Sequence, residues 1–309
     1  MAVLLSVIAI AAAFAGYIYI RGVPNYDTVP VNFTHAATAE SIERGRKLTL
    51  TLCAGCHMNI KTGKLSGRHM SESPPEFGYV YSANITGDQQ YGIGSYSDGE
   101  LVYLLRTGIK RSGQYAPAYM AKLPHLADED MNAIISFLRS DQPEVQPEPV
   151  AAESCRPSLL TKFLCYINFK PLPMPADKIN LPDTSDAVAT GKYLAHNLDC
   201  FTCHSGDFTR LDILHPEETW LYFGGGNKPL DYEGKVVLTS NITPDEETGI
   251  GNWTEEQFVR ALRYGIKEGE PSLRYPMVPY VHLTDKEAAA IFAYLKTIPP
   301  IKNKIDRQF

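Results

Sequence analysis

Two short cysteine motifs in this sequence have the spacing of a cofactor-attachment site. In each motif two residues separate a pair of cysteines, and a histidine directly follows the second cysteine. The motifs are Cys53-Ala54-Gly55-Cys56-His57 and Cys200-Phe201-Thr202-Cys203-His204. One helical turn can present both thiols to the vinyl groups at one edge of a haem, while the histidine reaches the iron. The pattern therefore predicts two covalently bound haem c groups, one at each motif.

Other chemistry open to paired cysteines fits this sequence less well. A lone Cys-x-x-Cys can be a redox dithiol or half of a zinc site. A thioredoxin-like dithiol needs a βαβ setting, and zinc needs a second compact pair of ligands; the sequence around neither motif supplies these. The formal charge of −6 argues against a nucleic-acid-binding protein, which would need a basic surface.

The sequence repeats itself, which indicates two related units. The stretch NITGDQQYGIGSYSDGELVYLLRTGIK, starting at Asn84, aligns without a gap with NITPDEETGIGNWTEEQFVRALRYGIK, starting at Asn241. The same offset aligns Met120 with Met277 and His125 with His282. Because the copies also share the cysteine motif, we expect each to hold its haem in the same way.

A haem iron needs a second axial ligand, and the repeat narrows the choice. Met120 and Met277 occupy equivalent positions in proline-containing loops before the last helix of each copy, so we predict that they coordinate the irons. The alternative is that both only pack against haem. We interpret the equivalent His125 and His282 as capping residues or propionate contacts, with iron ligation as a further alternative. The remaining candidates are Met58, Met70, Met131 and His69 in the first copy, and His196 and His215 in the second.

Several segments have the pattern of helices. Residues 41–52 lead into the first motif with helical apolar spacing. Ser97-Asp98-Gly99-Glu100 and Thr254-Glu255-Glu256-Gln257 resemble capped helix starts. Residues 128–139 and 285–296 have the apolar spacing of closing helices. The chain is therefore expected to be mainly α-helical.

On the basis of these motifs, each half of the chain resembles a class I cytochrome c. The whole resembles the multihaem cytochrome c subunits of membrane-bound alcohol and gluconate dehydrogenases. The likeness rests on the two cysteine motifs, on NITPDEETGIGNWTEEQFVRALRYGI and on the late YPMVPY, and it covers almost everything after about residue 40 except a linker. Those subunits typically have three haem motifs, whereas this sequence has two.

The resemblance suggests roles for three further pairs of repeated residues. In such a fold an aromatic pair and an arginine pair would contact haem propionates. The alternative is that the aromatic residues only pack in the core and the arginines lie on the surface. For an asparagine pair, the repeat alone suggests a role, which is to brace the loop beneath the haem. The pairs are Tyr96 with Trp253, Arg106 with Arg263, and Asn84 with Asn241.

The N-terminal run from Ala2 to Ile20 has no charged residue. As a helix it would be about 28 Å long, close to the hydrocarbon thickness of a bilayer. Tyr17 and Tyr19, beside Arg21, suit a membrane interface. A signal peptide cleaved near Ala15 and a buried core helix are the alternatives. With either a membrane anchor or a cleaved signal peptide, the rest of the chain is exported from the cytoplasm. We therefore expect a single-pass inner-membrane protein with its haem domains in the periplasm.

These features divide the chain into four segments. They are a transmembrane anchor at 1–22, a first cytochrome c domain at 36–141, a linker at 142–184 and a second cytochrome c domain at 185–309. The linker is rich in proline and acidic residues, and its centre at 157–169 is apolar enough for a short helix. It contains Cys155 and Cys165, for which we predict a disulfide, since disulfides persist in exported proteins. Two buried free thiols are the alternative.

The predicted function is electron transfer by a non-catalytic subunit of a respiratory or dehydrogenase-linked membrane complex. A haem with both axial positions filled has no place for a substrate. A dihaem enzyme of the peroxidase or thiosulfate-oxidising type would need one labile axial site, and a matched methionine in each copy disfavours that alternative.

Overall fold

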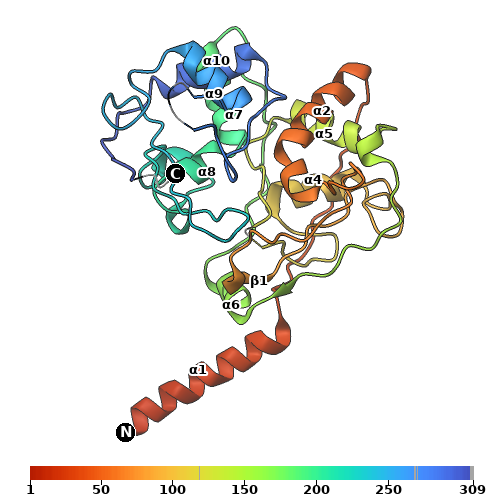
Figure 1. The fold of residues 1–309 in the computed structure, drawn as a ribbon. Helices are drawn as coiled ribbons and strands as arrows, with labels where there is room; N and C mark the ends of the chain where they lie inside the picture. The colour runs from red at the N-terminus through yellow and green to blue at the C-terminus, as the bar shows by residue number, and fades with distance from the viewer. Residues whose placement is uncertain (118, 268, 270, 307–309) are drawn as a thin grey trace. The chain divides into compact units, whose positions relative to one another are not determined.

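In a computed structural model, which describes residues 1–117, 119–267, 269 and 271–306, the chain is mainly helical (Figure 1). The α-helices are α1 (Ala2–Arg21), α2 (Ala39–Leu52), α3 (Ala54–His57), α4 (Asp98–Thr107), α5 (Asp128–Leu138), α6 (Leu159–Ile167), α7 (Ala187–Asn197), α8 (Cys200–His204), α9 (Glu255–Tyr264) and α10 (Asp285–Leu295). Short 3-10 helices cover Pro75–Phe77, Pro143–Val145, Phe208–Arg210 and Pro216–Glu218. Strands β1 (Gly78–Tyr79) and β2 (Arg156–Pro157) form a small antiparallel pair.

Local sequence explains where α4 and α9 begin and end. Ser97 and Thr254 each accept a hydrogen bond from the backbone N–H three residues on, and the side chain at that position accepts one in return. Gly108 and Gly265 end the two helices with left-handed φ angles of 82° and 72°. Both predicted capping boxes are therefore confirmed, and α4 and α9 are equivalent helices in the two copies of the repeat.

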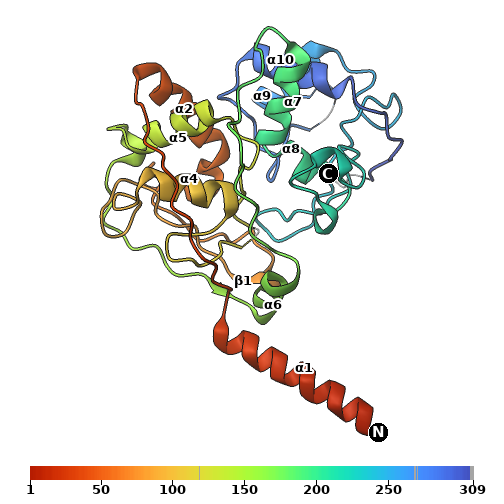
Figure 2. The same ribbon diagram turned by 180° about the vertical axis from the view of Figure 1, so that it is seen from behind.

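The closing helix α10 packs against α7 and α9, as two views of the ribbon show (Figures 1 and 2). Ala288, Ile291 and Leu295 are buried on α10 and belong to one apolar cluster. Gly191 on α7 allows the close approach, because a Cβ at this position would lie 1.8 Å from the Ala290 carbonyl oxygen. A glycine in the helix that leads into the second cysteine motif is thus required by packing.

Contacts along the chain define two compact units. The first comprises Met1–Ile42, Cys56–Pro124 and Asn132–Asp177; the second comprises Glu43–Gly55, His125–Met131 and Lys178–Phe309. Residues 43–55 and 125–131 thus group with the second unit, whereas the predicted domain boundaries place them in the first domain. Side-chain contacts explain the grouping: Lys47 pairs with Glu287 on α10, and Tyr193 donates a hydrogen bond of 2.6 Å to Asp130.

A half-buried carboxylate, that of Asp98, joins three segments of the first unit. Asp98, in the first turn of α4, accepts hydrogen bonds from the His35 backbone N–H at 3.1 Å and from Arg139 Nε at 3.0 Å. Arg139 also donates to the Ile93 carbonyl at 2.9 Å. Burial alone would raise the pKa of Asp98, but the bonds from His35 and Arg139 hold it below the ordinary value. The carboxylate therefore ties the chain before α2 to the start of α4 and the end of α5.

Helix α1 has the length and composition of a membrane span, and Ile18 is its buried residue. A signal sequence has the same properties, so composition alone does not distinguish these two possibilities. In Figure 1 α1 is the red helix that extends away from the remainder of the first unit.

The linker contains the predicted short helix, α6. Cys155 and Cys165 are not bonded to each other in the structure, and the disulfide between them stays a prediction. Cys155 Sγ donates a hydrogen bond of 3.0 Å to the Tyr81 carbonyl. Cys165 is fully buried beside Val23 and Tyr115. Helix α6 begins between the two cysteines and turns Cys165 into the core, while Cys155 stays in an extended segment against another stretch of backbone.

Candidate haem sites

The second cysteine motif is a single helical turn, α8, which presents Cys200, Cys203 and His204. His204 Nδ1 lies 2.8 Å from the Ser240 carbonyl oxygen. A carbonyl only accepts hydrogen bonds, so Nδ1 carries the proton and donates it. In a neutral ring this leaves the Nε2 lone pair free to bind a metal, which is how histidine ligands to metals are commonly held.

The first motif repeats this arrangement at the equivalent position. His57 Nδ1 lies 2.7 Å from the carbonyl oxygen of Ala83, the residue before the repeated Asn-Ile-Thr. Burial lowers the pKa of both His57 and His204, which favours the neutral, metal-binding form. Each motif thus offers two thiols and a correctly oriented imidazole, and this donor set fits haem c.

A glycine supports the histidine in each copy. The backbone N–H of Gly67 donates to the His57 carbonyl at 2.9 Å, and that of Gly225 donates to the His204 carbonyl at 2.6 Å. Both glycines have left-handed φ angles, 86° and 71°. A Cβ at Gly67 would lie 2.4 Å from the Ser82 carbonyl oxygen, so no side chain fits where the loop passes the motif.

Replacing Gly225 with alanine is expected to lower the free energy of unfolding by about 3 kcal/mol or more. Its Cβ would lie 2.5 Å from the Asn241 backbone nitrogen, in addition to the cost of a left-handed alanine. Gly234→Ala is the matched control, because Gly234 has a φ of 76° with nothing within 4 Å of its Cβ position. In the control, the free energy of unfolding should fall only by the cost of a left-handed alanine backbone, about 1–2 kcal/mol. Denaturant titration measures both, and equal losses would show that the close approach is unimportant.

The repeated asparagines brace the loops that carry the histidine acceptors. Asn84 Oδ1 accepts a hydrogen bond of 2.9 Å from the Thr86 N–H, and Asn241 Oδ1 accepts one of 2.9 Å from the Thr243 N–H. The Asn241 amide also donates to the Ile301 carbonyl at 2.7 Å. These bonds fix the backbone directly after the carbonyls that orient His57 and His204.

The thiols of the motifs differ in their surroundings. Cys200 packs against the apolar cluster of the second unit, and burial raises its pKa to about 12. Burial also raises the pKa of Cys56. A buried thiolate would be costly at these positions, whereas a thioether is neutral. Cys53 directly follows α2, and its N–H continues the helical hydrogen bonding to the Thr49 carbonyl at 2.8 Å.

The two predicted methionine ligands lie on loops that are tied to the preceding helix in the same way. The Leu123 N–H donates to the Leu105 carbonyl at 2.7 Å, and the equivalent Tyr280 N–H donates to the Leu262 carbonyl at 2.8 Å. Met277 is half-buried against the cluster that Cys200 also contacts. Coordination of iron by Met120 and Met277 stays a prediction.

Two basic side chains, the half-buried Lys122 and the buried Arg106, hold the loop of Met120, and the sequence pattern did not single out Lys122. Lys122 Nζ donates to the Ala116 and Pro117 carbonyls, both at 2.8 Å, and burial lowers its pKa to about 7. Arg106 is 2% exposed and donates to the Leu123 carbonyl at 2.9 Å. A surface position for Arg106 is therefore wrong. The equivalent Arg263 pairs with Asp285.

Most other candidate ligands have protein partners. Met131 is buried on α5, and His69 lies against the Tyr81 ring with a centroid distance of 4.8 Å. His125 Nε2 donates to the Ile213 carbonyl at 2.9 Å, and His196 Nε2 is hydrogen-bonded to the Tyr222 hydroxyl. His69 and His282 are exposed, and Met58 and Met70 are half-buried.

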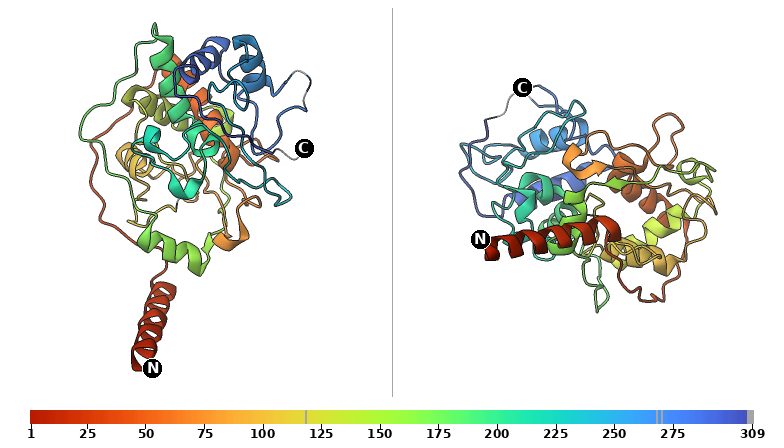
Figure 3. Two further views of the ribbon diagram at one scale, coloured as in Figure 1. Left: turned by 90° about the vertical axis from the view of Figure 1, so that its left-hand side faces the viewer. Right: turned by 90° about the horizontal axis from the view of Figure 1, so that it is seen from below.

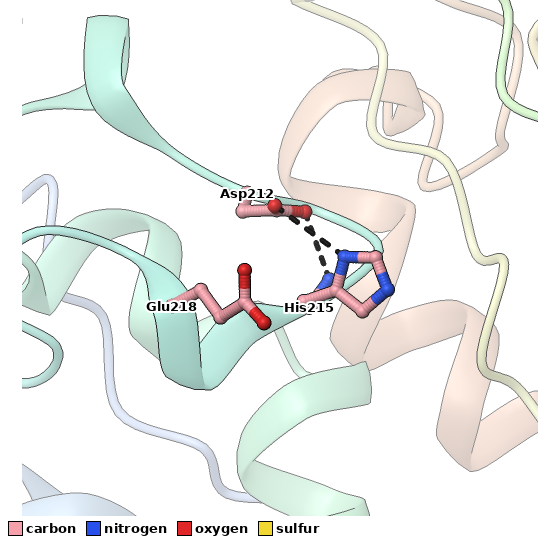
Figure 4. Close-up of side chains that lie close together, drawn as sticks. All are labelled: Asp212, His215 and Glu218. Carbon is pink, nitrogen blue, oxygen red and sulfur yellow. Dashed lines mark hydrogen bonds and ion pairs between the residues drawn. The ribbon is translucent and has the colours of Figure 1, made fainter.

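His215 belongs to a surface group with Asp212 and Glu218, whose potential ligand atoms lie within 4.8 Å of one another (Figure 4). Asp212 Oδ1 accepts hydrogen bonds from the backbone N–H groups of Leu214 and His215, at 3.0 and 2.8 Å. This local turn accounts for the grouping, and His215 and Glu218 are exposed. We assign no metal to it.

Comparison with known proteins agrees with the geometry. Residues 42–142 match the cytochrome c family. The chain contains a cytochrome c domain. It is also homologous to cytochrome subunits of several dehydrogenases. It is 29% identical to the fructose dehydrogenase cytochrome subunit of Gluconobacter japonicus, over 85% of this chain and 54% of the relative.

Two further relatives have similar coverage. The cytochrome c subunit of the quinone-dependent alcohol dehydrogenase of Gluconacetobacter polyoxogenes is 27% identical, over 81% of this chain and 54% of the relative. The gluconate 2-dehydrogenase cytochrome c subunit of Pantoea cypripedii is 27% identical, over 80% of this chain and 56% of the relative. The chain spans about half the length of these relatives.

Proposed function

We propose that this chain is a membrane-anchored dihaem cytochrome c that transfers electrons on the periplasmic side of the inner membrane, as a subunit of a dehydrogenase-linked complex. The observation that carries the proposal is the duplicated histidine geometry: His57 and His204 each donate Nδ1–H to a carbonyl at the same position of the repeat. A single attachment site would not require the arrangement twice.

Each part of the site has a defined task in this proposal. The cysteine pairs 53/56 and 200/203 hold haem c covalently, and the group supplies reversible one-electron exchange at its iron. The Ala83 and Ser240 carbonyls hold the Nδ1 proton of each histidine and leave Nε2 available to bind the iron. Met120 and Met277 would be the second protein ligands, which would leave no position for a substrate. The chain therefore passes electrons and leaves substrate chemistry to a partner.

Two observations support an anchored subunit. Helix α1 is long and apolar enough to cross a bilayer. The relatives named above are cytochrome subunits of dehydrogenases, and they align over four-fifths or more of this chain. A fixed relay beside the membrane suits a chain with two haem motifs and an apolar N-terminal helix.

Extraction of native membranes in mild detergent tests the assembly. On a native gel we expect haem stain in a species well above the 34.3 kDa of the chain, which also contains a dehydrogenase polypeptide. Addition of that dehydrogenase's substrate should reduce the haems of the species. Haem stain only at the monomer mass, across several mild detergents, would contradict a stable complex and leave a tethered electron shuttle.

A further inference from the structure

The linker helix α6 lies against the last two turns of α1, and both helices belong to the first unit. Figures 1 and 3 show α6 beside the end of α1 that joins the remainder of the chain. Phe14 and Phe163 meet edge to face with ring centroids 6.1 Å apart, and Tyr17 and Tyr166 do so at 5.9 Å. A linker element thus packs on the helix that is proposed to cross the membrane.

The contact points indicate the depth of α6 relative to that span. A helix rises 1.5 Å per residue, so Phe14 lies about 10 Å along the axis from Arg21, where α1 ends. Amphipathic helices at a membrane surface bury their apolar face roughly 5–10 Å into the boundary between headgroups and acyl chains. If α1 spans the bilayer, α6 lies at the depth of the interface.

Helix α6 also leaves large apolar side chains uncovered. Leu159, Leu160 and Ile167 are 46%, 45% and 54% exposed. The opposite face is buried, with Thr161 and Cys165 almost inaccessible. These three side chains are grouped on one face of a nine-residue helix, and grouped apolar side chains are typical of an interaction site.

The helix is held firmly in this position. Ser158 caps it by accepting a hydrogen bond of 3.1 Å from the Thr161 N–H. The Ser158 N–H and the Thr161 hydroxyl both donate to the Phe77 carbonyl, at 3.1 and 2.9 Å. The apolar residues are therefore presented by a fixed element of the first unit.

Basic and aromatic side chains border the same place. Lys162 Nζ lies 5.2 Å from the centre of the Tyr19 ring, and Arg21 is in the last turn of α1. Lys170, just after α6, is exposed. Tyrosines and cations at the end of a span are typical of the interface, where headgroups are polar and often anionic.

We propose that α6 is an interfacial membrane helix whose exposed Leu159, Leu160 and Ile167 insert into the lipid at the membrane surface beside the end of α1. The proposal rests on the membrane anchor of the proposed function. The protein would then contact lipid at two places, through the membrane-spanning helix α1 and through the surface helix α6. Since α6 is fixed to the first unit, the second contact sets the orientation of that unit on the bilayer.

Lipid photocrosslinking tests this in the full-length, haem-loaded protein. The protein is reconstituted into liposomes of phosphatidylethanolamine and phosphatidylglycerol that carry a diazirine on the acyl chain, irradiated and mapped by peptide mass spectrometry. We expect lipid adducts on α1 and also on residues 159–167. The double variant Leu160→Asp, Ile167→Asp should lose most adducts on α6 and keep those on α1. Val236→Asp, at an apolar side chain that is 56% exposed in the second unit, should change neither.

The outcomes separate the inference from the proposed function. Adducts on α1 with none on α6 would overturn the interfacial helix and leave the anchor intact. Adducts on neither helix would refute the anchor and the interfacial helix together. A protein crosslink at residues 159–167 in native membranes, without lipid adducts there, would assign this face to a partner subunit and overturn the inference.

Discussion

Replacing both Cys200 and Cys203 with alanine should halve the haem that remains attached to the denatured chain. Thioethers survive unfolding, whereas axial ligation does not, so the mass of the denatured protein counts the covalently attached groups. The unmodified chain should retain two haem masses, because each motif supplies a thiol pair and a histidine whose Nδ1 is hydrogen-bonded to a carbonyl. The double variant should retain one haem, at residues 53–57.

Replacing Cys155 and Cys165 with serine provides the matched control. It also removes two cysteines, but neither is followed by a histidine and neither lies in the repeat. Both haem masses should remain after this change. One haem on the unmodified chain would show that one motif is unused. Two haems on the Cys200→Ala, Cys203→Ala variant would show that the second is attached elsewhere.

Local features of this chain could be predicted because their causes lie within a few residues. Ser97 and Thr254 cap their helices through residues three positions away, so both starts are visible in the sequence. The same holds for α6, which begins at the predicted apolar centre of the linker, and for α1. A helical period and a cap are sufficient information for such elements.

The grouping of distant segments could not be predicted in this way. Lys47 pairs with Glu287, 240 residues further along the chain, and Tyr193 reaches Asp130. Charged residues at such positions are compatible with many partners, and only the folded chain selects one. The grouping of residues 43–55 with the second unit follows from contacts of this kind.

The candidate haem sites likewise have parts that the sequence predicts and parts that it does not. The cysteine motifs single out His57 and His204 as predicted ligands, but the hydrogen-bond acceptors of these histidines are backbone carbonyls, which any residue type supplies. Ala83 and Ser240 share no side-chain chemistry, and their only signal is their place before the repeated Asn-Ile-Thr. The role of Lys122 was missed for a related reason, since its partners are also carbonyls.

Replacing Met277 with alanine should open the second haem to external ligands and lower its reduction potential. A thioether ligand stabilises the reduced iron, and axial ligands shift haem potentials over a range of about 0.8 V. Met277 lies half-buried against the cluster that Cys200 also contacts, on a loop tied to α9 by the bond from Tyr280 to Leu262. The variant should lose half of the weak near-infrared sulfur-to-iron absorption and bind carbon monoxide at one haem when reduced.

Two controls make this outcome specific to coordination. His282→Ala changes the other repeated candidate, which is exposed, and should leave the absorption band and the potential unaltered. Met120→Ala should give the same change at the first haem, because its loop is tied to α4 through the equivalent bond from Leu123 to Leu105. A Met277→Ala protein with an unchanged spectrum would exclude this residue as a ligand. Carbon monoxide binding by the unmodified protein would indicate an open iron, and would favour a dihaem enzyme over an electron-transfer subunit.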